Sequence, residues 1–178
     1  MEAKKLKSEL SRRFKECQLE MHSEKTKIVN CRVKVASPPG VEKKFDFLGY
    51  QFRPRVSRSR AGELFAGFTP AISPSPAKAI RDVIRSWQLQ RHTYMDIKEL
   101  ASRLNPTIRG WIEYYGKFNR SEFNKVLRYL DLKIVGWVKR KYRKHGSYTK
   151  KPIAWLGKVA NSLPDLFAHW KFVRLPAE

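Results

Sequence analysis

Acidic residues are scarce in this chain: 16 of its 178 residues are Asp or Glu, against 38 that are Lys or Arg. The net charge is therefore +22, and the isoelectric point lies near 10.3. A globular domain with this excess of positive charge repels itself until it meets a polyanion. Nucleic acid is the expected partner, and no small-molecule substrate is predicted.

Cysteine is nearly absent, since Cys17 and Cys31 are the only two. They are too few for a disulfide framework, and they do not form the Cys-x-x-Cys pair of a zinc site. No metal site is predicted, because no histidine has ligand spacing with another histidine or a cysteine; the four are His22, His92, His145 and His169. Two free thiols suit a reducing compartment, and we expect a cytoplasmic protein.

Long apolar runs, lipidation signals and a secretion signal are missing as well. A membrane partner is therefore not expected, and the charged N-terminus lacks the apolar segment of a signal peptide. Five Trp, ten Phe and seven Tyr, within a hydrophobic fraction of 42%, argue against disorder. The composition predicts a folded, basic domain.

Catalytic constellations are also absent. A polymerase site needs closely placed carboxylates to hold two metal ions, and the aspartates of this chain are scattered: Asp46, Asp82, Asp96, Asp131 and Asp165. No glycine-rich phosphate loop and no Ser/His/Asp set is present. We predict no catalytic residue and no cofactor in this chain.

The first part of the chain mixes one helix with strands. An amphipathic helix is predicted from about Lys4 to Met21, with Leu6, Leu10 and Phe14 on its apolar face. Strands are expected over 28–33, over 44–53 with a bulge at Gly49, and over 64–69. The remaining segments predict a turn at Pro38-Pro39-Gly40 and an exposed loop or hairpin over Arg53–Arg60.

The pattern changes at Pro70, after which it is helical. Ser73-Pro74-Ser75-Pro76 begins the first helix, and a second is lined by Ile97, Leu100 and Leu104. The third begins at Asn105, the fourth at Ser121 and the last at Pro152. This predicts an α+β fold in two domains: residues 1–69, with a small antiparallel sheet, and residues 70–178, an α-helical bundle.

The segment from Asn105 to Gly116 concentrates informative residues. Asn105 can cap a helix, and Pro106 fits the first helical position. An apolar stripe follows at helical spacing, made by Ile108, Trp111, Ile112 and Tyr115. Arg109 and Tyr114 fall off that stripe, so we assign Arg109 to the surface and to RNA. In the alternative view this is a core helix with a charged outer face, and Arg109 pairs with Glu113.

Positive charge is densest over residues 139–151. Arg140, Lys141, Arg143 and Lys144 lie there, with tyrosines interleaved. Aromatic rings stack on unpaired bases while cations hold phosphates, which favours RNA binding. Because cations at a helix C-terminus are common, a solvated face is the alternative.

Several blocks together resemble one family, the group II intron reverse transcriptases and maturases. Two blocks look like the last palm segments: Glu24-Lys25-Thr26-Lys27 and Phe45-Asp46-Phe47-Leu48-Gly49-Tyr50. In that family the second block, here Phe47, Leu48, Gly49 and Tyr50, contributes to gripping the primer. The Asn105–Gly116 segment resembles the signature of the thumb, or maturase-specific domain. The end of the chain, Leu166 to Trp170, is similar to the C-terminus of bacterial members.

The resemblance implies binding of structured intron RNA and of a template–primer RNA/DNA duplex, with RNA contacts at Lys25, Lys27, Arg109, Tyr114 and the basic run. The family's fingers and paired aspartates have no counterpart here, so the chain looks like a fragment. Mg²⁺ would then be expected only in the full-length enzyme. An active enzyme would need the palm supplied by another chain, and a generic basic RNA- or DNA-binding module is the remaining alternative.

Overall fold

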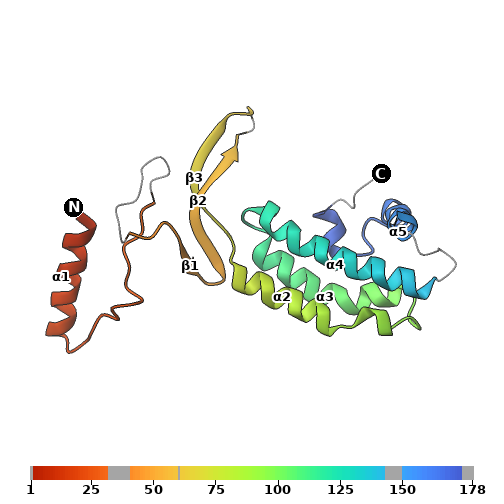
Figure 1. The fold of residues 1–178 in the computed structure, drawn as a ribbon, viewed down its shortest axis with the longest axis horizontal. Coiled ribbons are helices and arrows are strands. Elements are labelled where there is room, and N and C mark those ends of the chain that lie inside the picture. The colour runs from red at the N-terminus through yellow and green to blue at the C-terminus, as the bar shows by residue number, and fades with distance from the viewer. Residues whose placement is uncertain (1, 32–40, 60, 143–149, 174–178) are drawn as a thin grey trace. The chain divides into compact units, whose positions relative to one another are not determined.

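The computed structural model describes residues 2–31, 41–59, 61–142 and 150–173 of the chain (Figure 1). The chain divides into two compact units, Met1–Pro70 and Ala71–Glu178. The first contains a helix and a three-stranded sheet in the order β1-β2-β3, and the second is helical. The predicted α+β class is therefore confirmed.

Helix α1, Glu2–Glu16, is shorter than the sequence predicts. It ends because Gln18 adopts a left-handed φ of 57°, and the Leu19 and Gln18 amides then bond back to the Phe14 and Lys15 carbonyls at 2.8 and 3.0 Å. This is a Schellman closure with a residue other than glycine. No residue of α1 is buried, so its predicted apolar face is exposed.

The prediction of a strand over residues 28–33 is wrong for residues 28–31, the part of this range that the structure describes. Over residues 28–31 the backbone forms a single parallel bridge, Val29 to Glu42, supported by a 2.8 Å bond from the Asn30 amide to the Glu42 carbonyl. One bridge does not make a ladder. The turn predicted at residues 38–40 lies outside the described residues.

The strand predicted over 44–53 is in fact two strands. β1, Phe45–Phe47, and β2, Tyr50–Arg58, pair antiparallel with Phe47 opposite Tyr50. Leu48 and Gly49 have φ of 47° and 77°, the left-handed backbone that a two-residue type I′ hairpin requires. The predicted bulge at Gly49 is therefore a turn, because two consecutive left-handed residues reverse the chain instead of bending it.

Strand β3, Leu64–Ile72, confirms the predicted third strand and extends it. The arginine-rich stretch before it is the rest of β2 and a tight turn, where Gly62 has a φ of 88° and its amide bonds to the Ser59 carbonyl at 3.0 Å. The pairing with β1 ends at Phe52. Pro54 follows where β2 no longer has that neighbour, which is where a strand tolerates a missing amide donor.

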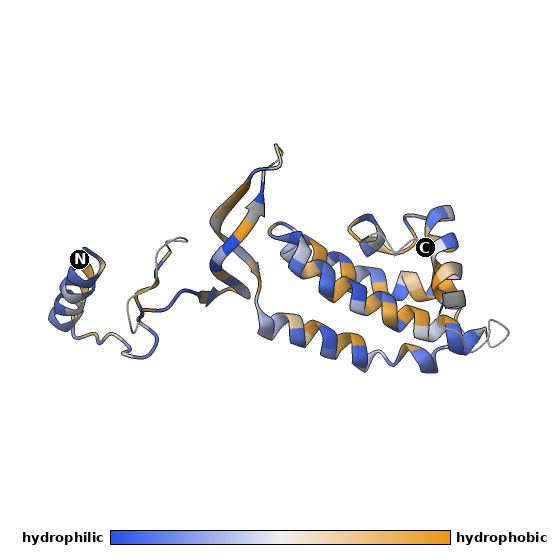
Figure 2. Ribbon diagram, turned by 45° about the horizontal axis from the view of Figure 1, so that its top comes forward, coloured by the Kyte–Doolittle hydropathy of each residue, from blue (hydrophilic) through white to orange (hydrophobic). Residues whose placement is uncertain are grey.

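The helical unit is built around three helices: α2, Pro74–Ser86; α3, Ile97–Tyr115; and α4, Arg120–Lys141 (Figure 1). The 3-10 helix η1, Leu89–Arg91, follows α2 and packs on α4. Hydrophobic and hydrophilic residues alternate along these helices at helical spacing (Figure 2). Their apolar sides share one core, centred on α4 residues such as Leu130, Ile134 and Trp137, each fully buried.

The sequence predicts two helices where the structure has one. α3 runs without a break through Asn105 and Pro106, so Asn105 is not a helix cap. The cap is Asp96, which forms a capping box with Glu99: each side chain accepts the other's backbone amide at 2.7 Å. Pro106 lies inside the helix on its exposed side, where the carbonyl it leaves unpaired can reach water.

Asn105 instead joins α3 to the end of the chain. Its side chain is buried; it donates to the Leu166 carbonyl at 2.9 Å and accepts from the Ala168 amide at 2.9 Å. Leu166 lies between α5, Lys150–Ser162, and the 3-10 helix η3, Ala168–Lys171, and Ala168 is the first residue of η3. One side-chain amide thus satisfies two backbone groups more than 60 residues away in the sequence.

A second buried polar contact lies between α4 and η3. The carboxylate oxygen Oδ1 of Asp131 lies 2.8 Å from Nε2 of His169 and accepts a bond from the Trp170 indole at 3.2 Å. His169 is fully buried, so this contact lies inside the fold. α4 begins one residue before the predicted start at Ser121, and α5 begins two residues before the predicted start at Pro152.

Replacement of Asn105 tests whether its side chain joins α3 to Leu166 and Ala168 or caps a helix. Asn105→Asp keeps a good capping side chain but loses the amide donor and brings a carboxylate to the Leu166 carbonyl, so we expect a loss of about 2–3 kcal/mol in the free energy of unfolding. Thr107→Ala, at an exposed site of the same helix, is the matched control and should change it by less than about 0.5 kcal/mol. Urea unfolding of both variants measures this. An Asn105→Asp protein as stable as the parent would contradict the bridge.

Candidate nucleic-acid interface

The second half of α3 has one side toward the core and one exposed side, as the sequence predicts. Ile108 is fully buried, and the partly buried Trp111 stacks on Trp87 with ring centroids 5.5 Å apart. Tyr115 also faces the core, and burial, with a smaller effect of the neighbouring Tyr114, raises its pKa above the ordinary 10.0. Arg109 lies on the exposed side.

Arg109 and Tyr114 are both exposed on α3, five residues apart and therefore about 140° apart around the helix. Among the described residues, no ion pair joins Arg109 to Glu113, which is also exposed. Tyr114 is 47% exposed and makes an edge-to-face contact with Tyr115 at 4.8 Å. The arrangement offers one cation and one aromatic ring to solvent, which is the combination that holds a phosphate and a base.

The glycine that ends the segment is required by close packing. A Cβ atom on Gly116 would collide with the Ile112 carbonyl oxygen and would lie 3.2 Å from the Phe172 ring. Arg120 covers the same place, with its guanidinium 5.2 Å from the centre of the Phe172 ring. Gly116 therefore lets the turn into α4 pack against the end of the chain.

The basic run at the end of α4 divides into exposed and engaged residues. Arg140 is exposed at the helix surface. The Lys141 ammonium donates to the carbonyls of Thr93 and Met95 at 2.7 and 2.6 Å, so it ties α4 to the loop before α3. The predicted RNA contact at Lys141 would have to break both bonds. Arg143 and Lys144 lie outside the described residues.

The outer face of α4 carries further cations that the sequence prediction did not single out. Lys125, Arg128 and Lys139 are exposed and share one face by helical spacing. Lys125 is paired with Glu122 at 2.9 Å. These cations are thus spread along the outer side of the helix.

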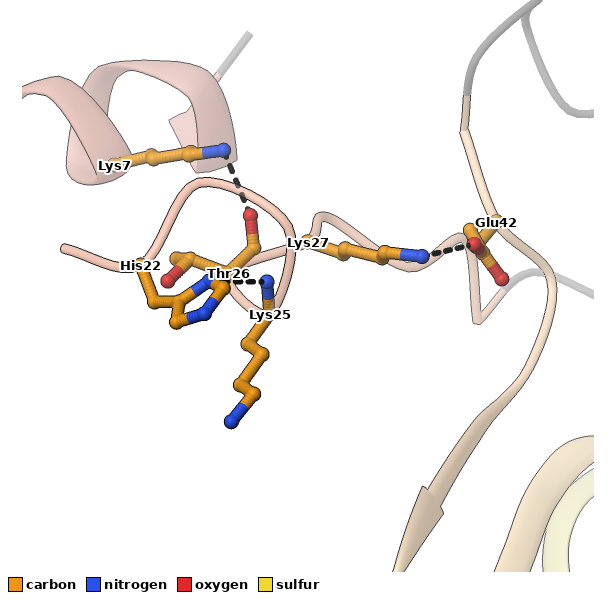
Figure 3. Close-up of polar contacts among 6 residues, drawn as sticks. All are labelled: Lys7, His22, Lys25, Thr26, Lys27 and Glu42. Carbon is orange, nitrogen blue, oxygen red and sulfur yellow. Dashed lines mark hydrogen bonds and ion pairs between the residues drawn. The ribbon is translucent and has the colours of Figure 1, made fainter.

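In the N-terminal unit the two predicted lysines differ in their surroundings (Figure 3). The Lys27 ammonium pairs with the Glu42 carboxylate at 2.7 Å. This hydrogen bond and the attraction between the charges raise the pKa of Lys27 above 10.5 and lower the pKa of Glu42 below 4.5. Lys25 is exposed, and its backbone amide lies 3.4 Å from Nδ1 of His22.

The loop that holds these lysines is attached to α1. The Lys7 ammonium donates to the Thr26 carbonyl at 2.8 Å (Figure 3). A shallow cavity of about 450 Å³ lies here, lined by Lys4, Lys7 and Lys27 among others. Three lysines close together predict affinity for an anion, but Lys27 is neutralised locally by Glu42 and Lys7 is engaged with the backbone.

The hairpin predicted to grip a primer presents its tip to solvent. Phe47 and Leu48 are 60% and 68% exposed, and they precede the turn residue Gly49. Tyr50 is buried by contrast, at 9% exposure, so its ring supports the hairpin. Of the four predicted residues, Phe47 and Leu48 are thus the ones with exposed apolar side chains.

No metal-binding group of three or more His, Cys, Asp or Glu side chains occurs within the described part of the chain. None of the helices described is long and apolar enough to cross a membrane. The aspartates do not converge: Asp82 pairs with Arg85, Asp96 caps α3 and Asp131 is buried against His169.

Comparison with known families identifies the helical unit. Residues 77–155 match the model of the group II intron maturase-specific domain, over α2, η1, α3, α4 and the first half of α5. No curated protein and no solved structure matches the chain. Residues 77–155 are thus similar to a group II intron maturase-specific domain, which confirms the resemblance seen in the sequence for this part of the chain.

The titration of Glu42 tests its pair with Lys27. Because the folded pKa of Glu42 is lowered, the contribution of the pair to stability is present above pH 4.5 and is lost as the pH falls through the folded pKa of Glu42. Because the folded pKa of Lys27 is raised, the contribution persists up to pH 10.5 and is lost as the pH rises through the folded pKa of Lys27. Carbon NMR of the Glu42 carboxyl should give a pKa below 4.5 in the parent and a higher one in Lys27→Met. Lys25→Met is the control. An equal pKa in all three proteins would contradict the pair.

Arg109 and Trp111, two positions apart, should respond differently to substitution. Trp111→Ala removes half of a partly buried ring stack against the core and should cost about 3 kcal/mol of stability. Arg109→Ala should stay within about 0.5 kcal/mol of the parent, weaken RNA binding and reduce the magnitude of its salt slope by about one. Thermal melts and RNA titrations measure both. If Arg109→Ala melts far below the parent, its assignment to the RNA surface is wrong.

Proposed function

We propose that this chain binds structured intron RNA through its helical unit, as the RNA-binding part of a group II intron reverse transcriptase and maturase. The observation that carries the proposal is the match of residues 77–155 to the maturase-specific domain. The charge supports it, because a net +22 is far more than a domain needs for solubility. Intron RNA is the polyanion that the domain's description names.

The distribution of acidic residues strengthens this argument. Among the described residues of the helical unit, most acids already have a structural role: Asp131 is buried, Asp96 and Glu99 form the capping box, and three others pair with a nearby cation. Those three are Asp82, Glu122 and Asp165. Exposed cations such as Arg103, Arg109 and Arg128 are therefore left for phosphates.

Binding of a template–primer duplex is the second part of the proposal. The exposed Phe47 and Leu48 at the tip of the β1–β2 hairpin can lie against sugars or a base pair in a shallow groove. Short rigid hairpins place apolar side chains well, because the type I′ turn fixes their direction. DNA synthesis itself would need carboxylates to hold metal ions, and the described residues supply no such group.

A generic basic RNA-binding module remains the second candidate, favoured by the same charge. The two differ in what they recognise: a maturase domain should prefer folded intron RNA, whereas a generic module should respond to phosphate density alone. Affinity for intron RNA and for another structured RNA of equal length therefore separates them.

RNA titrations at several salt concentrations test the proposal. If about six phosphates are neutralised, the slope of log K against log salt should be roughly −4 to −5, at about 0.7–0.9 per contact. Intron RNA should bind at least about tenfold more tightly than the control RNA at moderate salt. Equal affinities would support the generic module, and an affinity that hardly changes with salt would contradict phosphate binding altogether.

A further inference from the structure

A cleft of about 460 Å³ opens on the helical unit between the end of α2, the 3-10 helix η1 and the second half of α4. Four of its lining residues are cations, and none of the described lining residues is acidic; the cations are Arg85, Arg91, Lys133 and Arg140. Like charges repel, so four of them converging on one hollow is not what an ordinary solvated surface shows.

Most of this charge is not compensated. Arg85 pairs with Asp82 one turn earlier on α2, and the Lys133 ammonium lies 5.0 Å from the centre of the Tyr129 ring. Arg91 and Arg140 take part in no ion pair among the described residues. The C-terminus of α2 contributes a partial negative charge of about half a unit, which is small beside the cations. The cleft is therefore positive.

The walls of the cleft are held in place. The indole of Trp137 donates to the His92 carbonyl at 3.0 Å, and Lys141 binds the Thr93 and Met95 carbonyls. Leu89, at 4% exposure, anchors η1 in the core. A preformed site binds without first ordering its own loop, which favours affinity. Lys141 thus helps to hold the loop that follows η1 against α4.

Two glutamines add neutral hydrogen-bonding groups to the lining, Gln88 and Gln90. Gln88 has a left-handed φ of 45°, which turns the chain from α2 into η1. The Gln90 amide approaches Gly136 so closely that a Cβ there would lie 3.2 Å from its nitrogen. Amides both donate and accept hydrogen bonds, so they suit the hydroxyls and base edges of a nucleotide. A bare phosphate would need only donors.

We propose that this cleft holds one nucleotide of the bound RNA strand by its phosphate. Arg91 and Arg140 bind the phosphate oxygens, Arg85 and Lys133 add to the positive field, and the glutamines contact the sugar or base. Clefts of this volume take ligands of nucleotide size, whereas a duplex needs an extended surface. The inference rests on the proposed function and locates part of its binding site. Inorganic phosphate shares the chemistry and is the other source of the anion.

A matched pair of double variants tests the cleft. Arg91→Gln/Arg140→Gln removes two cleft charges, and Lys117→Gln/Lys158→Gln removes two exposed charges that do not line it. At one salt concentration we expect the cleft variant to lose about 100-fold in affinity for intron RNA and the control less than about fivefold, since converging charge-assisted hydrogen bonds are stronger than single surface contacts. Thermal melts check that both variants fold.

The outcomes are distinct. Equal losses in the two variants would overturn the cleft and leave the proposed function standing, whereas a parent chain that binds no RNA would overturn both. NMR of the arginine Nε–H groups of the parent gives a second measurement that needs no variant. A short single-stranded RNA should shift Arg91 and Arg140, and inorganic phosphate should do so only at far higher concentration. Shifts by phosphate at the lower concentration would overturn the assignment to RNA.

Discussion

The burial of α4 is the constraint on which the helical unit depends. α2, η1 and α5 all pack against this helix, and nine of its residues are buried. A helix surrounded on most sides can expose only a narrow face, so its cations are confined to that face and to its C-terminal end. The core that stabilises the domain therefore also decides where positive charge can reach a phosphate.

Buried polar contacts attach the end of the chain to this core. Asn105 satisfies one backbone group before η3 and one at its first residue, and Asp131 binds His169 and Trp170 within η3. Unlike apolar contacts, such bonds have one good geometry, since a buried polar group without its partner is costly. They fix how the last residues pack on α3 and α4. The first and last residues of the Asn105–Gly116 segment therefore have structural roles, because both serve the packing of the fold.

The cations of this protein form two groups. Some bind other groups of the protein itself, and others remain available to a partner. Lys141 and Lys27 hold a backbone carbonyl pair and a carboxylate, respectively. Arg109, Arg128 and Arg140 are exposed and take part in no ion pair among the described residues. Charge density along the sequence does not separate these groups. A binding surface for RNA is defined by the exposed cations that do not pair with other groups of the protein itself.

The sequence by itself determined the strong positive charge and the helical character after Pro70, because net charge and helical periodicity are properties of the chain alone. Tertiary structure decided the rest. Asn105-Pro106 has the local form of a helix start, yet burial against Leu166 and Ala168 keeps α3 continuous. The Leu48-Gly49 turn was hidden because alternation looks the same on one strand as on two. Arg85, Arg91, Lys133 and Arg140 converge only because three elements meet, and no spacing in the sequence encodes that meeting.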